Sequence, residues 1–227
     1  IDDAKDTLEY LISCYESNNS PLVYPILLKD NSSGKNIIWA IDDYAYLGDG
    51  YQAHQHIKEE LITGDKEHLI KSRIFKTQDT QKSRSKEKAE VFTPSWVCNA
   101  QNNLVDNVWF DIEGVFNIEC GKEWTATTNH IIFPIGKSWQ DYVQDVRMEI
   151  TCGEAPYLVS RYDTCTGESI DIKNRIGLLD RKLRVVSENT TTKNEWLYWA
   201  KIAIQSIYGF EWQGDNLIIA RKNSNHD

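Results

Sequence analysis

The feature that most constrains this chain is the stretch 149–158, which reads Glu-Ile-Thr-Cys-Gly-Glu-Ala-Pro-Tyr-Leu. An apolar run closes on the acidic Glu149, residues with small side chains follow, and Tyr157 begins the next apolar segment. In such a turn at the end of a strand, backbone amides can point outward at a small polar ligand. We therefore predict a ligand-binding turn in an α/β fold.

The composition limits the class of protein. The 227 residues are 41% hydrophobic and 26% charged, which is typical of a globular chain with one large domain, and no apolar run is long enough to span a membrane. The formal net charge of -9 requires any contact with nucleic acid to use a local basic patch. Five cysteines without a C-x-x-C pair, and a start without a secretory leader, predict reduced thiols and a cytoplasmic location. Dispersed histidines argue against zinc, and a first residue other than methionine suggests a processed product or a piece of a longer chain.

We expect residues 1–67 to form an N-terminal α+β region. Apolar residues at helical spacing predict a helix over Asp2–Asn19. Two β-favouring runs, Val23–Leu28 and Asn36–Ile41, flank a polar turn and predict a hairpin. The acid-rich segment that follows, 42–51, lacks the ligand spacing of a calcium loop.

Residues 68–89 form a basic linker. Seven lysines and arginines stand there against two acids: Lys71, Arg73, Lys76, Lys82, Arg84, Lys86 and Lys88 against Asp79 and Glu87. The segment either tracks DNA phosphates, with Lys82, Arg84 and Lys86 as the contacts, or is a solvated, mobile connection.

Two further elements flank the predicted turn. Phe92-Thr93-Pro94 is a helix-start signature, in which Thr93 is expected at the N-cap ahead of a helix over residues 100–106. Residues 206–212 form a β-type run that ends in Glu211 and Trp212, ahead of a helix that starts near Asn216. A carboxylate at a strand end can accept both hydroxyls of a ribose, and an adjoining aromatic ring can stack on adenine. We expect the strand ending at Glu149 and the strand 207–210 to be parallel neighbours.

The three elements, in this order, resemble the S-adenosylmethionine-dependent DNA methyltransferases of the gamma arrangement. The resemblance implies a partial Rossmann-like core over residues 90–227, S-adenosylmethionine as cofactor, and the cofactor-binding half of an adenine-N6 methyltransferase from a restriction-modification system. It implies that the cofactor is bound by Phe92, Thr93, Pro94, Glu149, Cys152, Gly153, Ala155, Glu211 and Trp212. The implied partners are DNA and either a restriction subunit or a missing C-terminal half.

The sequence departs from this family in three ways. Ala155 stands where the family usually has a second glycine, which suits alanine only if that position does not need a positive φ. Near fifty residues separate the turn from Ile207, against about twenty in a simple βαβ unit. No two prolines are adjacent, so the Pro-Pro-aromatic catalytic signature is absent. We therefore expect a chain truncated before its catalytic loop, assign no catalytic residue and no metal, and leave open whether it is an enzyme.

Two other functions remain open. A restriction endonuclease, or a fused endonuclease-methylase, would use Asp111, Glu113, Glu119 and Lys122, although Glu119 and Lys122 are one residue too far apart for the usual Glu-x-Lys arrangement. A nucleic-acid- or protein-binding module without catalysis would use basic segments and the aromatic residues and would need no cofactor. One such segment is the helix predicted over 176–186 with the residue before it. Its cations are expected on a solvated face or against DNA: Arg175, Arg181, Lys182 and Arg184.

Overall fold

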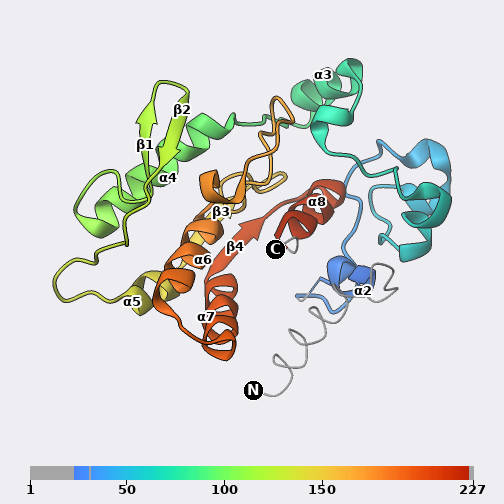
Figure 1. Ribbon diagram of the computed structural model, residues 1–227. Coiled ribbons are helices and arrows are strands. Elements are labelled where there is room, and N and C mark those ends of the chain that lie inside the picture. The colour runs from blue at the N-terminus through green and yellow to red at the C-terminus, as the bar shows by residue number, and fades with distance from the viewer. Residues whose placement is uncertain (1–22, 31, 225–227) are drawn as a thin grey trace. The chain divides into compact units, whose positions relative to one another are not determined.

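The computed structural model describes residues 23–30 and 32–224 and mixes α-helices with short strands (Figure 1). The helix expected over Asp2–Asn19 lies outside the described residues. The chain divides into two compact units, which are described separately below. Unit 1 comprises the described residues up to Lys71 together with Trp212–Lys222, and unit 2 comprises Ser72–Glu211 and the residues from Asn223. The sequence-based division at residues 67 and 89 stays a prediction.

Unit 1 is built around a small apolar core. Trp39, Ile57 and Ile218 are fully buried in it. Helix α2 (Val23–Leu28) and helix α8 (Gly214–Ser224) belong to this unit as far as Lys222. Four short 3-10 turns of the same unit follow α2, at 45–47, 49–51, 59–61 and 64–66. The Gly214 N–H donates to the Trp39 carbonyl over 3.0 Å, which fixes the start of α8 against the core.

The hairpin predicted in unit 1 is only partly correct. The polar turn is present, since Lys29 and Asn36 form an antiparallel bridge, but Val23–Leu28 is a helix and not a strand. Pro25 explains the difference. Proline removes a donor that a strand needs, whereas the first turn of a helix has no partner for that donor.

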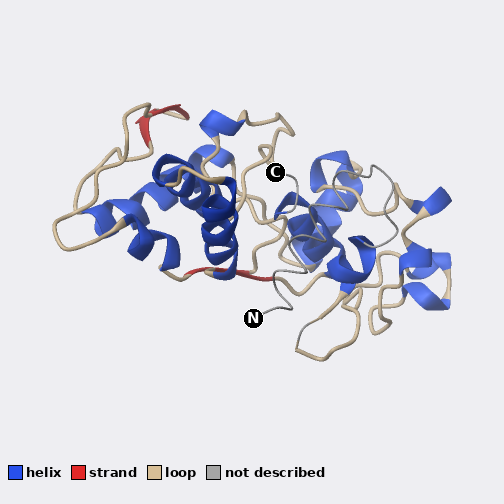
Figure 2. Ribbon diagram, turned by 60° about the horizontal axis from the view of Figure 1, so that its bottom comes forward, coloured by secondary structure: helices blue, strands red, loops and turns tan. Residues whose placement is uncertain are grey.

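Unit 2 contains most of the regular structure. Its helices are α3 (Gln78–Glu87), α4 (Ser95–Phe110), α5 (Trp139–Gln144), α6 (Leu178–Asn189) and α7 (Lys193–Gln205). Its strands form two short pairs, an antiparallel β1 (Asn117–Cys120) with β2 (Glu123–Ala126) and a parallel β3 (Arg147–Ile150) with β4 (Ile207–Phe210) (Figure 2). None of the described helices has both the length and the apolar character that crossing a membrane requires.

Strands β3 and β4 confirm the prediction that these two segments are parallel neighbours. Glu149 lies opposite Gly209 in the register, and the chain between the strands passes through α6 and α7. Gly209 packs closely here, because a β carbon at this position would lie 3.1 Å from the Cys152 Sγ and 3.0 Å from a methyl carbon of Leu158, so either side chain would have to shift. The carboxyl ends of both strands therefore reach the same turn.

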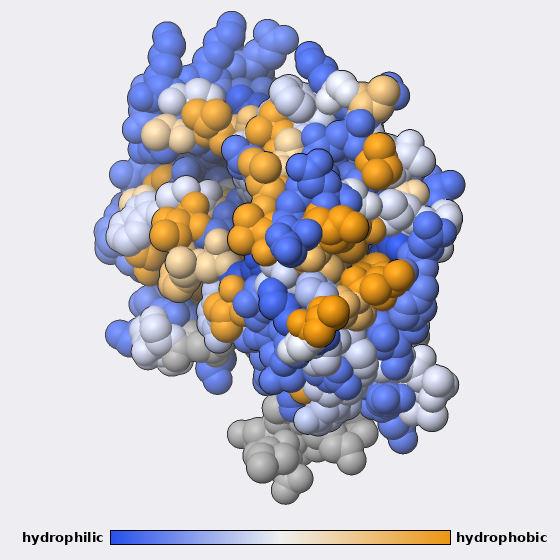
Figure 3. Space-filling view, turned by 90° about the vertical axis from the view of Figure 1, so that its left-hand side faces the viewer, coloured by the Kyte–Doolittle hydropathy of each residue, from blue (hydrophilic) through white to orange (hydrophobic). Residues whose placement is uncertain are grey.

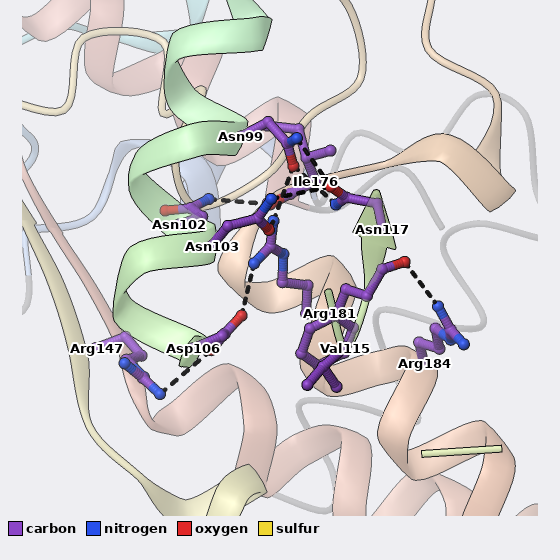
Figure 4. Close-up of polar contacts among 12 residues, drawn as sticks. Asn99, Asn102, Asn103, Asp106, Val115, Asn117, Arg147, Ile176, Arg181 and Arg184 are labelled. Atoms are coloured by element: carbon purple, nitrogen blue, oxygen red, sulfur yellow. Dashed lines mark hydrogen bonds and ion pairs between the residues drawn. The ribbon is translucent and has the colours of Figure 1, made fainter. Parts of the chain in front are cut away.

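A buried polar network crosses the interior of unit 2 (Figure 4). Asp106 on α4 accepts hydrogen bonds from Arg181 Nη1 over 2.6 Å and from the Tyr142 hydroxyl over 2.9 Å. Lys182 is also fully buried, and its Nζ donates to the Val143 carbonyl over 3.0 Å. The expectation that Arg181 and Lys182 lie on a solvated or DNA-facing surface is therefore wrong. Arg181 is held by a carboxylate distant in sequence, and Lys182 is held by buried oxygen acceptors, so both cations are buried with partners.

Candidate functional site

The turn after β3 is tied to the end of β4 by two backbone donors. The Cys152 N–H donates to the Phe210 carbonyl over 2.9 Å, which continues the strand pairing. The next amide, that of Gly153, donates to Glu211 Oε2 over 2.7 Å. These bonds bring the acidic ends of two parallel strands, Glu149 and Glu211, to one turn of backbone. In open α/β sheets, ligands bind outside the carboxyl ends of parallel strands.

The backbone of this turn is unusual. Thr151, Gly153 and Ala155 have φ angles of +57°, +55° and +65°, so every second residue is left-handed. Ala155 was expected to be comfortable only without a positive φ, and it has one. Its methyl group is buried and its N–H donates to the Cys152 carbonyl over 2.7 Å. Left-handed conformations cost non-glycine residues about 1–2 kcal/mol each, and such strain concentrates at binding sites.

Glu149 is the most perturbed acid of the turn. Its Oε2 is buried and has no hydrogen-bond partner among the described residues. Burial, and then the charge of Glu211, raise the pKa of the Glu149 carboxyl from 4.5 to about 8. Burial and the same carboxyl raise the thiol pKa of Cys98 and that of Cys152 to about 12 each. The Glu149 carboxyl therefore holds its proton at neutral pH, and a cation placed beside it would lower this pKa and favour the ionised carboxylate.

The Phe-Thr-Pro element lies against this turn. A β carbon at Gly153 would be 3.8 Å from Cε1 of Phe92, so the ring packs over the glycine. The Arg73 guanidinium stands 5.1 Å from the centroid of the same ring. The carbonyl of Thr93 accepts from the Thr164 hydroxyl over 3.1 Å. Burial raises the pKa of Tyr157, while a hydrogen bond with Thr93 acts in the opposite direction, which places Tyr157 of the turn beside this element.

The expected capping role of Thr93 is wrong. Helix α4 begins at Ser95, and its N-cap is Pro94, which provides no side-chain cap. Asp163 replaces that cap, since Ser95 N–H donates to Asp163 Oδ2 over 2.6 Å. Sequence reasoning missed Asp163 because it lies 68 residues from the amide that it caps. It also missed Arg73 and Tyr157 as neighbours of the turn. The sequence showed Tyr157 only as the aromatic residue that begins the apolar segment after the turn.

The structure therefore gathers part of the predicted cofactor site. Phe92, Glu149, Cys152, Gly153 and Glu211 lie around the turn, with Thr93, Pro94 and Ala155 beside them in the chain. Trp212 is exposed and belongs to unit 1, so its predicted stacking role stays a prediction.

The three predicted DNA contacts do not share one environment. All lie on helix α3, where Lys82 and Lys86 are exposed. Arg84 is buried, and its Nη2 lies 2.5 Å from Glu90 Oε2. Arg84 therefore does not fit a phosphate contact in this structure. Within the segment 68–89, residues 78–87 form this helix, and Arg84 is its buried cation.

The endonuclease alternative gains nothing from the structure. Asp111, Glu113 and Glu119 are all exposed. Glu119 accepts from Asn103 Nδ2 over 2.6 Å. Across the described part of the chain, no group of three or more histidine, cysteine, aspartate or glutamate side chains is placed to hold a metal ion.

Comparison with known proteins adds no assignment to this geometry. No protein-family model matches the chain. No curated protein and no solved structure matches it either.

Proposed function

We propose that this chain is the S-adenosylmethionine-binding portion of a DNA adenine-N6 methyltransferase of a restriction-modification system. One observation carries the proposal: the Gly153 N–H, in the turn after β3, holds the carboxylate that ends the parallel neighbour β4. In this proposal β3 and β4 belong to a Rossmann-like sheet, and the cofactor lies across their carboxyl ends.

The residues present fit the charges of this cofactor. S-adenosylmethionine carries a sulfonium cation and, at its methionine end, an ammonium cation beside a carboxylate, and Glu149 offers the ammonium a buried carboxyl oxygen without a partner. An ammonium donor there would supply the hydrogen bond that a buried oxygen requires. Glu211, oriented by the Gly153 amide, is suited to the ribose hydroxyls. Phe92 packs over Gly153 and would close the methionine end.

The proposal is limited to binding. Transfer of a methyl group to adenine requires polar groups that grip the exocyclic amine and an aromatic ring that stacks on the extruded base. The Pro-Pro-aromatic signature that serves this purpose in the resembling family does not occur in the 227 residues. We therefore propose that this chain binds the cofactor and that DNA is its substrate partner.

Calorimetric titration with S-adenosylmethionine tests the proposal. The intact chain should bind, and Glu211→Ala should weaken binding about tenfold or more, because a lost charged hydrogen bond costs on the order of 1.5–3 kcal/mol. Glu168→Ala, at an exposed site, is the matched control and should bind normally. No heat of binding at millimolar cofactor would refute the proposal, and equal binding by the Glu211 variant would remove that residue from the site.

A further inference from the structure

Arg73 lies at the turn after β3, although 81 residues separate it from that turn in the sequence. Its backbone N–H donates to Oε1 of Glu154, the residue that follows Gly153, over 2.6 Å. Its guanidinium carbon lies 5.1 Å from the centroid of the Phe92 ring, and that ring packs over Gly153. The main chain and the side chain of Arg73 are therefore both held at this turn, and the aromatic ring restricts where the guanidinium can point.

The Arg73 guanidinium forms no ion pair with any described residue. Its Nε is buried and has no hydrogen-bond acceptor in this part of the chain. Glu154 does not serve as the partner, because its two carboxylate oxygens accept from the Arg73 backbone N–H and from the Tyr162 hydroxyl. A buried donor of a charged group without an acceptor is costly, so an anion from outside the described residues would be favoured there.

Asp163 does not neutralise the guanidinium either. Burial and then the charge of Asp163 raise the pKa of the Cys165 thiol, whereas the charge of Arg73 lowers it, so both charges lie near this thiol. The carboxylate of Asp163 is nevertheless directed at backbone donors. It accepts from the N–H groups of Ser95, Cys165 and Thr166 over 2.6–2.8 Å.

The turn thus presents two buried polar atoms of opposite kind without partners, Oε2 of Glu149 and Nε of Arg73. The two side chains do not satisfy each other in the structure. The acceptor suits an ammonium group, and the donor, on a guanidinium, suits a carboxylate. An α-amino acid carries an ammonium and a carboxylate on one carbon atom, so it matches both groups at once.

We propose that Arg73 binds the carboxylate of S-adenosylmethionine while Glu149 binds its ammonium, so that the site selects ligands with a complete α-amino-acid end. The planar fork of a guanidinium matches a carboxylate with two parallel hydrogen bonds. This inference rests on the proposed function. It adds to the site a residue that lies outside the three sequence elements on which the resemblance depends.

Calorimetric titration of the intact chain with two ligands tests the inference without a mutation. S-adenosylmethionine is compared with its decarboxylated analogue, which keeps the sulfonium and the ammonium and loses only the carboxylate. The chain should bind S-adenosylmethionine at least about tenfold more tightly, because a hydrogen bond between charged groups contributes that much. Equal affinities would overturn the inference and leave the proposed function standing. No binding of S-adenosylmethionine would refute the proposed function, and the inference with it.

Arg73→Met then tests the residue itself. Methionine keeps an apolar side chain beside Phe92 and the backbone N–H that Glu154 accepts, so the fold should be retained, which circular dichroism checks. The variant should bind S-adenosylmethionine at least about tenfold more weakly than the wild type and the decarboxylated analogue equally well. An equal loss for both ligands would show a merely structural role and overturn the inference. Lys173→Met, which also removes one exposed cation, is the matched control and should bind both ligands normally.

Two other results would also overturn the inference. If Arg73→Met weakens the binding of duplex DNA in fluorescence anisotropy and leaves the binding of S-adenosylmethionine unchanged, the guanidinium binds a phosphate. The adenosine part of the ligand could instead adhere to the apolar side chains that gather on the face shown in Figure 3, where part of α4 lies. Val108→Ser, at a side chain of α4 that is 84% exposed, should leave both affinities unchanged. A loss as large as that of Arg73→Met would place the ligand on that face.

Discussion

Glu149→Gln should stabilise the protein and at the same time weaken the proposed binding of S-adenosylmethionine. The Glu149 carboxyl is raised from a pKa of 4.5 to about 8 by burial and then by the charge of Glu211. The folded state therefore retains a proton that the unfolded state releases between these two pKa values. The stability contributed by this proton is fully present below pH 4.5 and is lost as the pH rises toward 8. Glutamine removes this dependence, because it stays neutral at every pH.

The size of the effect follows from linkage. Each unit of pKa corresponds to roughly 1.4 kcal/mol. The rise from 4.5 to about 8 would therefore lower the free energy of unfolding by about 4–5 kcal/mol at pH 8 if solvent did not screen the carboxyl. Glu149 is half-buried, and solvent screening reduces this to about 2 kcal/mol. An ammonium group of the ligand needs the ionised carboxylate, so the affinity of the wild-type chain should rise up to about tenfold per pH unit between pH 6 and 8. The affinity of the variant should stay low and flat.

Urea unfolding at several pH values from 5 to 8, paired with calorimetric titration at the same pH values, measures both effects. Glu119→Gln, which replaces an exposed glutamate, is the control and should follow the wild type in both assays. Parallel stability curves for Glu149→Gln and the wild type would refute the assigned pKa. A stabilised variant with unchanged binding would detach Glu149 from the ligand.

Two further predictions concern α3 and α8. Replacing Lys82 and Lys86 with alanine should weaken the binding of duplex DNA, measured by fluorescence anisotropy, and should reduce its salt dependence by about two phosphate contacts. Arg84→Ala should instead destabilise the fold by about 3–5 kcal/mol, because it leaves the buried Glu90 carboxylate without its partner. An unchanged salt slope for the lysine pair would make α3 an ordinary solvated helix. Gly214→Ala should destabilise unit 1 by more than about 3 kcal/mol in urea, because its β carbon would lie 2.1 Å from the Ile38 carbonyl oxygen, and an unchanged midpoint would contradict this close approach.

The sequence predicted the type and position of helices and strands better than it predicted which face of each helix is buried. The strands β3 and β4 and the helix α6 lie close to their expected positions, because their apolar residues are bounded by polar residues and turn signals. Val23–Leu28 failed because a six-residue apolar run fits a helix or a strand equally well. Periodicity alone did not reveal which side of a helix is buried. In α4 the buried side carries Asn99, Asn102 and Asp106 beside Cys98 and Phe110, and Arg181, on a distant segment, satisfies Asp106.

The candidate site was predictable as a set of residues but not as a shape. The acid at the end of β3, the small residues and the acid after β4 were visible in the sequence, whereas the left-handed backbone of Thr151 and Ala155 was not, because neither residue favours it. What holds this strained turn in place is the neighbouring strand: the Cys152 amide pairs with the Phe210 carbonyl, and the Gly153 amide pairs with Glu211, 58 residues away. The turn thus depends on the parallel pairing of β3 with β4. A ligand that contacts Glu211 and the turn together would stabilise that pairing, because it would bind only the state in which both strands are in place.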